Sequence, residues 1–451
     1  MKSRINKYTL MLALLLPAIA VKAQTEYSLN KALEYALLNN ENVKNAQLST
    51  LDAEAQVFET RADGLPQING SFNYTNNLFI AKSPIPNSFF TGDPNAEGVT
   101  LVGFGAQHIG NLNVGLEQML WDGSFFIGLK AAKVLREKVI VDKVKAEVDV
   151  IEQVTKAYYL VLVNQTRVDL INANLITLNT TLEETRTLYE NGFAERIDVS
   201  RLQVQTNNLL AEKSGVEQAV TTSKDLLKLS MGMSVEEEIT LTDQLEALDF
   251  NYDLTELNGF SLANRVEVQQ LDYLKELAGL QIKNTTSQYI PKVTFNAGWG
   301  RNTGSNDFSD LTNGKKWFSN SQIGLNINIP IFDGLRKKYT IQRNKIELET
   351  LNNQYSLLTN NLTQEFENAK RNLDVSLEQL EVQKSNMELA QDVSSITKEK
   401  YKEGVGSNLE VTNAEKDYKE AETNYLNALY NAIIAKVDLD KALGKLQNND
   451  N

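Results

Sequence analysis

The chain has no cysteine and only one histidine among its 451 residues. The absence of cysteine excludes disulfides, thiolate metal sites and a lipid-modified N-terminal cysteine. A single histidine excludes a histidine-rich metal cluster, so we expect no metal site and no cofactor. Basic residues are also comparatively few: 58 Asp and Glu outnumber 45 Lys and Arg, for a net charge of −13. Phosphate binding needs a basic face, so this balance argues against a nucleic-acid partner.

The N-terminus has the pattern of a secretory signal peptide, predicted over residues 1–23. Lys2, Arg4 and Lys7 form a basic segment, residues 10–21 are an apolar run, and small residues precede a cleavage position before Gln24. An uncleaved membrane anchor is the alternative, but a spanning helix needs about 20 apolar residues. We therefore expect an exported protein.

Proline is scarce and unevenly placed. None of the seven prolines lies between residues 124 and 290, or after residue 330. Proline inside a helix costs about 3 kcal/mol, so these stretches are where long helices can form. Apolar residues between 348 and 380 recur with a period close to that of a helix. The stretches 123–192 and 334–404 predict two helices that each reach about 100 Å at 1.5 Å per residue.

Four windows alternate strictly between apolar and polar residues: 66–75, 111–117, 293–300 and 322–329. Such alternation predicts strands with one apolar and one polar face. A hairpin packed on a soluble core is one interpretation. The polar positions hold Asn, Gln and Thr rather than Lys and Glu, which favours the polar lumen and apolar exterior of a transmembrane barrel.

Motifs recur in the same order in the two halves, which indicates a tandem duplication. Leu65-Pro66 is repeated by Ile290-Pro291, and Trp121-Asp122-Gly123 by Phe332-Asp333-Gly334. The first predicted repeat covers residues 24–232, with a helix, strands near 66–76 and 108–121, a long helix, a tip near 192 and a return helix. A linker follows at 233–257. The second repeat covers 258–451, with a helix, strands near 291–301 and 320–332, a long helix, a tip near 404 and a return helix.

These motifs resemble those of the TolC outer-membrane efflux protein family over about residues 26–445. The resemblance rests on the Leu-Pro and Ile-Pro strand starts, the Trp-Asp-Gly and Phe-Asp-Gly strand ends, and two Tyr-x-x-Gly tips followed by Ile-Asp-Val and Leu-Glu-Val. It implies an α+β membrane protein of TolC-like fold. Long antiparallel coiled-coil helices would form a periplasmic tunnel, and four strands per chain would contribute to a shared twelve-stranded trimeric β-barrel.

The same resemblance implies a passive outer-membrane exit duct of a tripartite efflux or secretion system. Its expected partners are two further copies of the chain (a homotrimer), a periplasmic adaptor protein, an inner-membrane transporter of RND, ABC or MFS type, and outer-membrane lipid. Counting strands supports the trimer independently. Four strands cannot close a barrel, eight give an interior filled by side chains, and twelve are the smallest multiple of four that encloses a lumen.

Three groups of residues are candidate functional sites. The resemblance places Glu410 and Asn413 at the pore constriction, and Gly406 stands where some relatives carry an arginine. Asp198, the matching carboxylate after the first tip, is a further candidate for the constriction. The adaptor-docking tips would be Tyr189, Gly192, Phe193, Tyr401, Gly404 and Val405. Trp121, Phe332 and Trp299 are candidate membrane-interface aromatics. Simple helix capping also explains the tip glycines and carboxylates, and a packed joint between barrel and tunnel explains the aromatics.

Two other functional classes are alternatives to the exit duct. An exported structural or adhesive coiled-coil protein without a channel would use the helices but would not need four amphipathic strands. An enzyme is not expected, because we find no nucleophile–base or carboxylate pair at an informative spacing.

Overall fold

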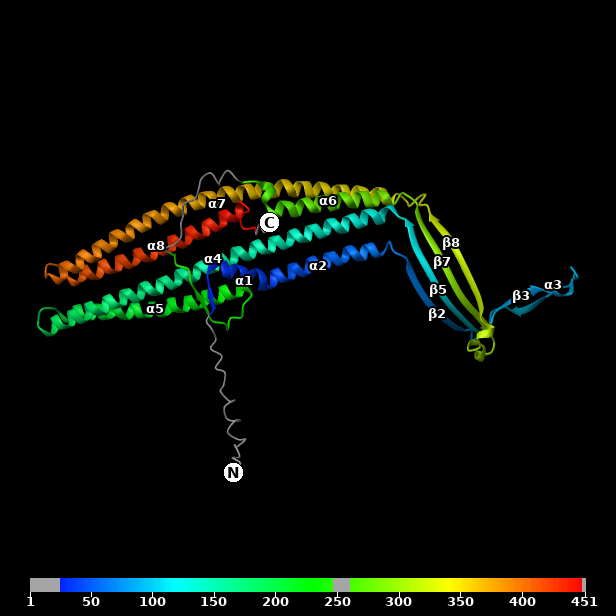
Figure 1. Ribbon diagram of the computed structural model, residues 1–451, viewed down its shortest axis with the longest axis horizontal. Coiled ribbons are helices and arrows are strands. Elements are labelled where there is room, and N and C mark those ends of the chain that lie inside the picture. The colour runs from blue at the N-terminus through cyan, green and yellow to red at the C-terminus, as the bar shows by residue number, and fades with distance from the viewer. Residues whose placement is uncertain (1–24, 246–259, 448–451) are drawn as a thin grey trace, which may run out of the picture. The chain divides into compact units, whose positions relative to one another are not determined.

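The computed structural model describes residues 25–245 and 260–447 (Figure 1). The predicted signal peptide at 1–23 lies outside these residues, and so do residues 246–257 of the predicted linker at 233–257. Helices dominate the described chain: α1 (Leu29–Asn39), α2 (Glu41–Ala62), α4 (Gly123–Glu190), α5 (Arg196–Met231), α6 (Val266–Ser287), α7 (Arg336–Lys402) and α8 (Asn408–Ala442). The two long helices predicted from the proline-free stretches are α4 and α7. None of the helices in the described residues is long and apolar enough to span a membrane.

One antiparallel sheet contains the four predicted strands in the order β2-β5-β7-β8 (Figure 1). These are β2 (Gln67–Asn76), β5 (His108–Trp121), β7 (Lys292–Ser305) and β8 (Phe318–Asn328). The order joins the two halves of the chain through the β5–β7 pair. Strands β2 and β8 are the edges, and no strand within the described ranges pairs with their outer sides.

The cross-strand register places the apolar residues on one face of the sheet. Directly opposed residues of an antiparallel pair point to the same side. The apolar rows are Trp121–Val293–Ile327, Phe295–Leu325, Ile68–Leu116–Ala297–Ile323 and Val114–Trp299. The other face carries Asn69, Ser71, Asn111, Asn113, Asn296, Asn320 and Gln322. The alternation seen within single strands is therefore maintained across the whole sheet.

Two strand ends differ from the expected boundaries. Strand β8 ends at Asn328 rather than near residue 332, and β7 continues to Ser305 rather than stopping near 301. Pro330 has no backbone N–H and so cannot continue the ladder. Beyond residue 301, β7 still pairs with β5, as far as the contact between Ser305 and His108.

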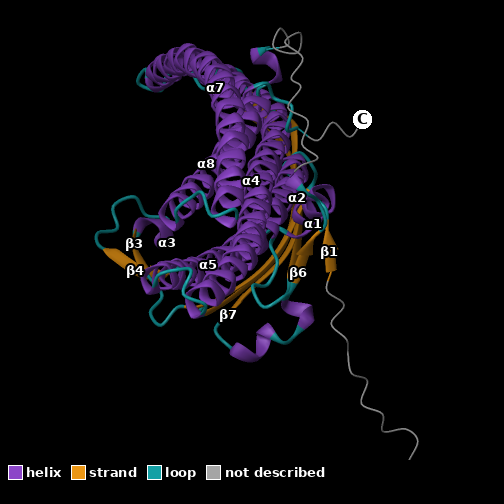
Figure 2. Ribbon diagram, turned by 90° about the vertical axis from the view of Figure 1, so that its left-hand side faces the viewer, coloured by secondary structure: helices purple, strands orange, loops and turns teal. Residues whose placement is uncertain are grey.

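The first strand–strand connection contains a small hairpin of its own, β3 (Lys82–Pro86) and β4 (Val99–Gly103), with the short helix α3 (Ser88–Thr91) between them. The second connection holds two single turns, η4 (Phe308–Leu311) and η5 (Gly314–Lys316). A separate parallel pair joins β1 (Thr25–Tyr27) to β6 (Ile239–Leu241), and the two lie side by side in Figure 2. These elements were not predicted.

The chain divides into two compact units, and neither corresponds to one sequence repeat. Unit 1 contains residues 1–45, 144–265 and 362–451; unit 2 contains residues 46–143 and 266–361. Each unit therefore draws on both repeats, and α4 and α7 run from one unit into the other. The four-stranded sheet belongs to unit 2. Both helix tips belong to unit 1.

The core of unit 1 is built from α4 packed against β1, α1, α5 and α8. Val154, Tyr158 and Val161 are fully buried at its centre. The Tyr158 hydroxyl donates a 3.0 Å hydrogen bond to the Tyr27 carbonyl, so the buried phenol is satisfied and β1 is anchored to α4.

Candidate functional site

The two helix tips close with the same backbone geometry. Gly192 and Gly404 have φ values of 80° and 77°, the left-handed conformation that favours glycine at a helix end. At the first tip, the Phe193 N–H donates to the Leu188 carbonyl at 2.8 Å; at the second, the Val405 N–H donates to the Lys400 carbonyl at 3.0 Å. Sequence reasoning located both turns from their Tyr-x-x-Gly spacing.

The tips present apolar side chains to solvent. Phe193 is 82% exposed and Val405 is 79% exposed, the largest exposures among the predicted tip side chains. Tyr189 is also exposed. Tyr401 differs, because it is half-buried and its hydroxyl lies 3.5 Å from the Thr185 hydroxyl of α4. Tyr401 thus helps to hold the two helical hairpins together near their tips.

The two tip carboxylates have different environments. Asp198 forms a capping box at the start of α5, where its Oδ2 accepts the Glu195 N–H at 3.3 Å, and Arg201 lies 3.8 Å away. Glu410 occupies the same position in α8, but there the Ser407 hydroxyl accepts the Glu410 N–H at 3.2 Å. The Glu410 carboxylate is exposed and has no hydrogen-bond or ion-pair partner among the described residues.

Asn413 and Gly406 complete this end of α8. Asn413 is exposed one turn after Glu410, so both side chains lie on neighbouring positions of one helix face. A Cβ at Gly406 would lie 3.1 Å from the Tyr401 nitrogen. The backbone at the end of α7 therefore leaves little room for a side chain at this position.

The three candidate interface aromatics lie at different levels. Trp121 ends β5 and its ring packs 5.5 Å from that of Phe126 at the start of α4. Trp299 lies in the middle of β7, opposite Val114. Phe332 follows β8 and is 79% exposed. The apolar rows of β7 lie between the levels of Trp121 and Trp299, and the next residue on this face of β7 is Arg301. On β2 and β5 the apolar face continues into the row of Arg301, through Phe72 and Leu112.

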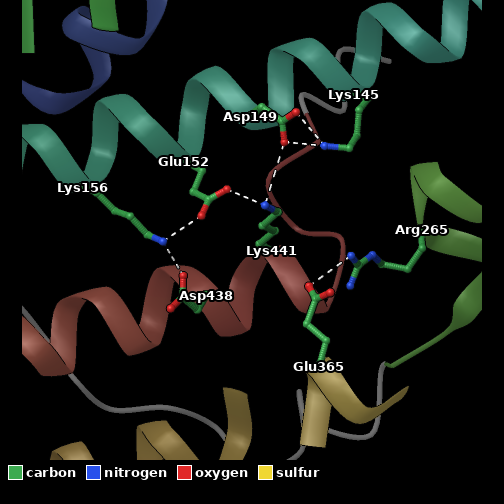
Figure 3. Close-up of polar contacts among 8 residues, drawn as sticks. All are labelled: Lys145, Asp149, Glu152, Lys156, Arg265, Glu365, Asp438 and Lys441. Carbon is green, nitrogen blue, oxygen red and sulfur yellow. Dashed lines mark hydrogen bonds and ion pairs between the residues drawn. The ribbon is translucent and has the colours of Figure 1, made fainter. Parts of the chain in front are cut away.

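An ion-pair ladder between α4 and α8 was not predicted (Figure 3). Lys156 donates to Glu152 at 2.7 Å and to Asp438 at 2.5 Å, and Lys441 donates to Glu152 at 2.6 Å. Burial alone would raise the pKa of Glu152, but the hydrogen bonds from Lys156 and Lys441 outweigh it and lower that pKa below the ordinary value of 4.5. Burial would lower the pKa of Lys156, yet its bonds to Asp438 and Glu152 raise it.

A groove of about 530 Å³ lies near the tips, between α4, α5 and α8. Its wall combines apolar and charged side chains: Leu178, Ile197, Arg201, Val204, Glu415 and Lys416. Within the described ranges, no group of three metal-binding side chains is arranged to hold an ion.

A family model described as "Outer membrane efflux protein" matches residues 32–233 and 260–445, which is most of the chain. The chain belongs to the outer membrane efflux protein family. This assignment confirms the family predicted from the motifs, together with its outer-membrane location and periplasmic helical part.

Relatives of this outer membrane efflux protein are distant in sequence. The outer membrane protein TolC of Vibrio cholerae serotype O1 is 21% identical over 342 residues, covering 75% of this chain and 77% of TolC. The probable efflux pump outer membrane protein TtgC of Pseudomonas putida is 22% identical over 426 residues, covering 92% of this chain and 83% of TtgC.

Solved structures share the fold at still lower identity, so the predicted TolC-like fold is confirmed. The outer membrane protein VceC from Vibrio cholerae has a TM-score of 0.69 at 18% identity, covering 92% of this chain and 96% of VceC. The CmeC outer membrane channel of Campylobacter jejuni has a TM-score of 0.72 at 16% identity, covering 94% of this chain and 87% of CmeC.

The family assignment favours the exit duct over the two other functional classes. This outer membrane efflux protein is an exit duct at the cell surface, and its named relatives are outer-membrane and efflux-pump proteins rather than enzymes. An adhesive stalk would also leave the four-stranded amphipathic sheet unexplained.

Proposed function

We propose that three copies of this chain form a closed passive duct, in which each copy contributes four strands of a twelve-stranded barrel. The observation that carries this proposal is the pair of open edges, β2 and β8, on a sheet with one apolar face. An unpaired edge in lipid leaves backbone groups without partners at a cost of several kcal/mol each. Pairing β2 of one copy with β8 of the next removes every edge.

The dimensions of the sheet support a membrane-spanning role. Strands β2, β5, β7 and β8 have 10, 14, 14 and 11 residues. A tilted transmembrane strand needs about 9–11 residues. The apolar rows of β7 run from Val293 to Trp299, which is about 20 Å at 3.3 Å per residue. Trp121 would then lie near one membrane surface, and Phe72, Trp299 and Arg301 near the other, as aromatic girdles do in such barrels.

The tips would dock a periplasmic adaptor, which in turn couples the duct to an inner-membrane transporter of RND, ABC or MFS type. The exposed Phe193 and Val405 side chains support this role, because isolated apolar residues on rigid turns are suitable anchors for a partner. Glu410 and Asn413, and less directly Asp198, would line the entrance to the duct.

The barrel can be tested by cross-linking, which is simple here because the chain has no cysteine of its own. A single cysteine at Ser71 on the edge strand β2 is combined with a second cysteine at each position from 319 to 327 of β8. We expect covalent trimers only at alternate positions of β8, those that share the polar face with Ser71. Cysteine at Asn113 in the central strand β5 is the matched control and should give no links between chains. A monodisperse monomer in mild detergent, without links at any position, would contradict the proposal.

A further inference from the structure

The polar face of the sheet is almost free of charge. Within the four strands, its charged side chains are Lys292 and Glu117. Lys292 lies 3.3 Å from Asp122, so its charge is paired. Glu117 is exposed and has no ion-pair partner among the described residues. Its direct neighbours in the register are Gln67 of β2 and Asn296 of β7. Glu117 is therefore an unpaired carboxylate in a surface of amides and hydroxyls.

Glu117 lines a hollow of about 820 Å³ in this face, and three glycines line it as well. The hollow is lined by Asn69, Asn113, Asn296, Asn320 and Gln322 in addition to Glu117. These glycines are Gly115 of β5, Gly298 of β7 and Gly324 of β8. The hollow thus combines one fixed negative charge with several neutral hydrogen-bonding groups.

The fold itself does not require these glycines. A Cβ at Gly115 or Gly324 would meet no atom within 4 Å, and one at Gly298 would make only ordinary contact with Gln322. None of the three has a positive φ. Glycine inside a strand costs about 0.5–1 kcal/mol relative to alanine. Such glycines often mark a close approach of a ligand or another backbone. The space above them is therefore open to another molecule.

We propose that the Glu117 hollow is a contact site for a cationic, hydrogen-bonding group of the transported cargo, such as a primary ammonium. This inference rests on the proposed trimeric duct, in which the polar face lines the lumen and three Glu117 carboxylates lie at one level. Low-dielectric walls focus the field of these charges and raise the local concentration of cations. The surrounding amides accept and donate hydrogen bonds without adding a competing charge.

The test is block of single-channel current by the polyamine spermine, added to the side that the strand loops face, in low salt. All recordings use the Glu410→Ala background, so that the proposed entrance ring does not contribute. Glu117→Gln should raise the half-blocking spermine concentration at least tenfold, and Glu117→Asp should leave it within about threefold. Adding Asn296→Asp to Glu117→Gln returns a carboxylate to the same row and should restore the block.

A second variant tests the hollow rather than the charge. Gly115→Thr places a Cβ where no atom is within 4 Å, so the trimer should still assemble. It should weaken spermine block with Glu117 intact. Conducting trimers whose spermine block is unchanged by both Glu117→Gln and Gly115→Thr would overturn this inference and leave the duct standing. A chain that forms no conducting trimer would overturn both.

Discussion

Asn40 and Arg265 make the same contact in the two halves of the chain. The Asn40 amide donates a 2.8 Å hydrogen bond to the Ser230 carbonyl at the end of α5, and Arg265 donates a 3.2 Å bond to the Ala442 carbonyl at the end of α8. Asn40 immediately precedes α2 and Arg265 immediately precedes α6, the helices that lead toward the strands. Both bonds satisfy a helix-terminal carbonyl that has no partner within its own helix.

The second half adds a charge to this contact. Arg265 is 3% exposed and also pairs with Glu365 of α7 at 3.2 Å. Arg265→Met should lower the free energy of unfolding by about 2–4 kcal/mol, because it leaves Glu365 without this partner and the Ala442 carbonyl without its bond. The measurement is thermal loss of the helical circular-dichroism signal in detergent. Adding Glu365→Gln should recover part of the loss. Full recovery would mean that the carbonyl bond contributes nothing.

Gly232 should tolerate substitution far less than Gly192. Both have a positive φ, 72° and 80°, which costs a non-glycine residue about 1–3 kcal/mol. A Cβ at Gly232 would also lie 2.7 Å from the Asn39 carbonyl oxygen, whereas one at Gly192 would meet no atom within 4 Å. Gly232→Ala should therefore reduce the amount of folded protein in outer-membrane fractions well below that of Gly192→Ala. Equal yields would show that the α1–α5 contact is easily displaced.

The two faces of β8 should respond differently to a positive charge. Leu325 lies in the apolar row with Phe295, and the next residue, Asn326, opposes Thr294 on the polar face. An arginine facing lipid costs about 2–4 kcal/mol near the midplane. Leu325→Arg should therefore hinder membrane assembly, while Asn326→Arg should assemble and alter conductance. Extraction from outer membranes and bilayer recordings separate the two. If both variants assemble equally well, the face assignment is wrong.

Glu410 should affect ion selectivity more than Asp198. Three unpaired Glu410 carboxylates at a narrow entrance would attract cations, whereas Asp198 is held in a capping box with Arg201 nearby. In low-salt recordings, Glu410→Ala should weaken cation preference and Asn413→Asp should strengthen it. Asp198→Ala should have the smaller effect. All three differences should shrink in 1 M salt, where the Debye length is about 3 Å. Unchanged selectivity in an intact Glu410→Ala trimer would leave Glu410 as a helix cap only.

The α4–α8 ladder predicts a loss of stability in acid. The folded pKa of Glu152 lies below its ordinary value of 4.5, so ionised Glu152 stabilises the fold. This contribution is complete above pH 4.5 and is lost as the pH falls through the folded pKa. Glu152→Gln should lower the free energy of unfolding by about 1.5–3 kcal/mol at pH 7. Glu217→Gln, in an exposed pair with Lys213, is the control and should change it little. The gap between wild type and Glu152→Gln should close below pH 4.5, as the pH falls through the lowered folded pKa of Glu152. A gap that persists there would assign the stabilisation to packing.

Local patterns in the sequence predicted the regular elements well. Proline positions and period-2 alternation depend on neighbouring residues alone, and they located the long helices, the four strands and the polar face to which Glu117 belongs. The pairing of β1 with β6 could not be predicted in this way, because two three-residue strands more than 200 residues apart have no pattern of their own.

The polar contacts within the site were the least predictable part. Glu152 and Lys156 alone are an ordinary exposed pair on a helix, and only the fold brings Asp438 and Lys441 to them. The same holds for Glu117 and Glu410. Their sequence context shows a carboxylate on a polar face or in a first helical turn, but whether it has a partner depends on residues far along the chain.

The division of each compact unit between both repeats has a consequence for how the protein is made. An exported chain enters the periplasm with its N-terminus first, yet unit 1 needs α8 to cover α4, and the sheet of unit 2 needs β7 and β8 beside β5. Neither core can close on the first half of the chain. Most of the polypeptide must therefore cross the inner membrane before it folds, and during that interval its apolar strands are exposed to aggregation.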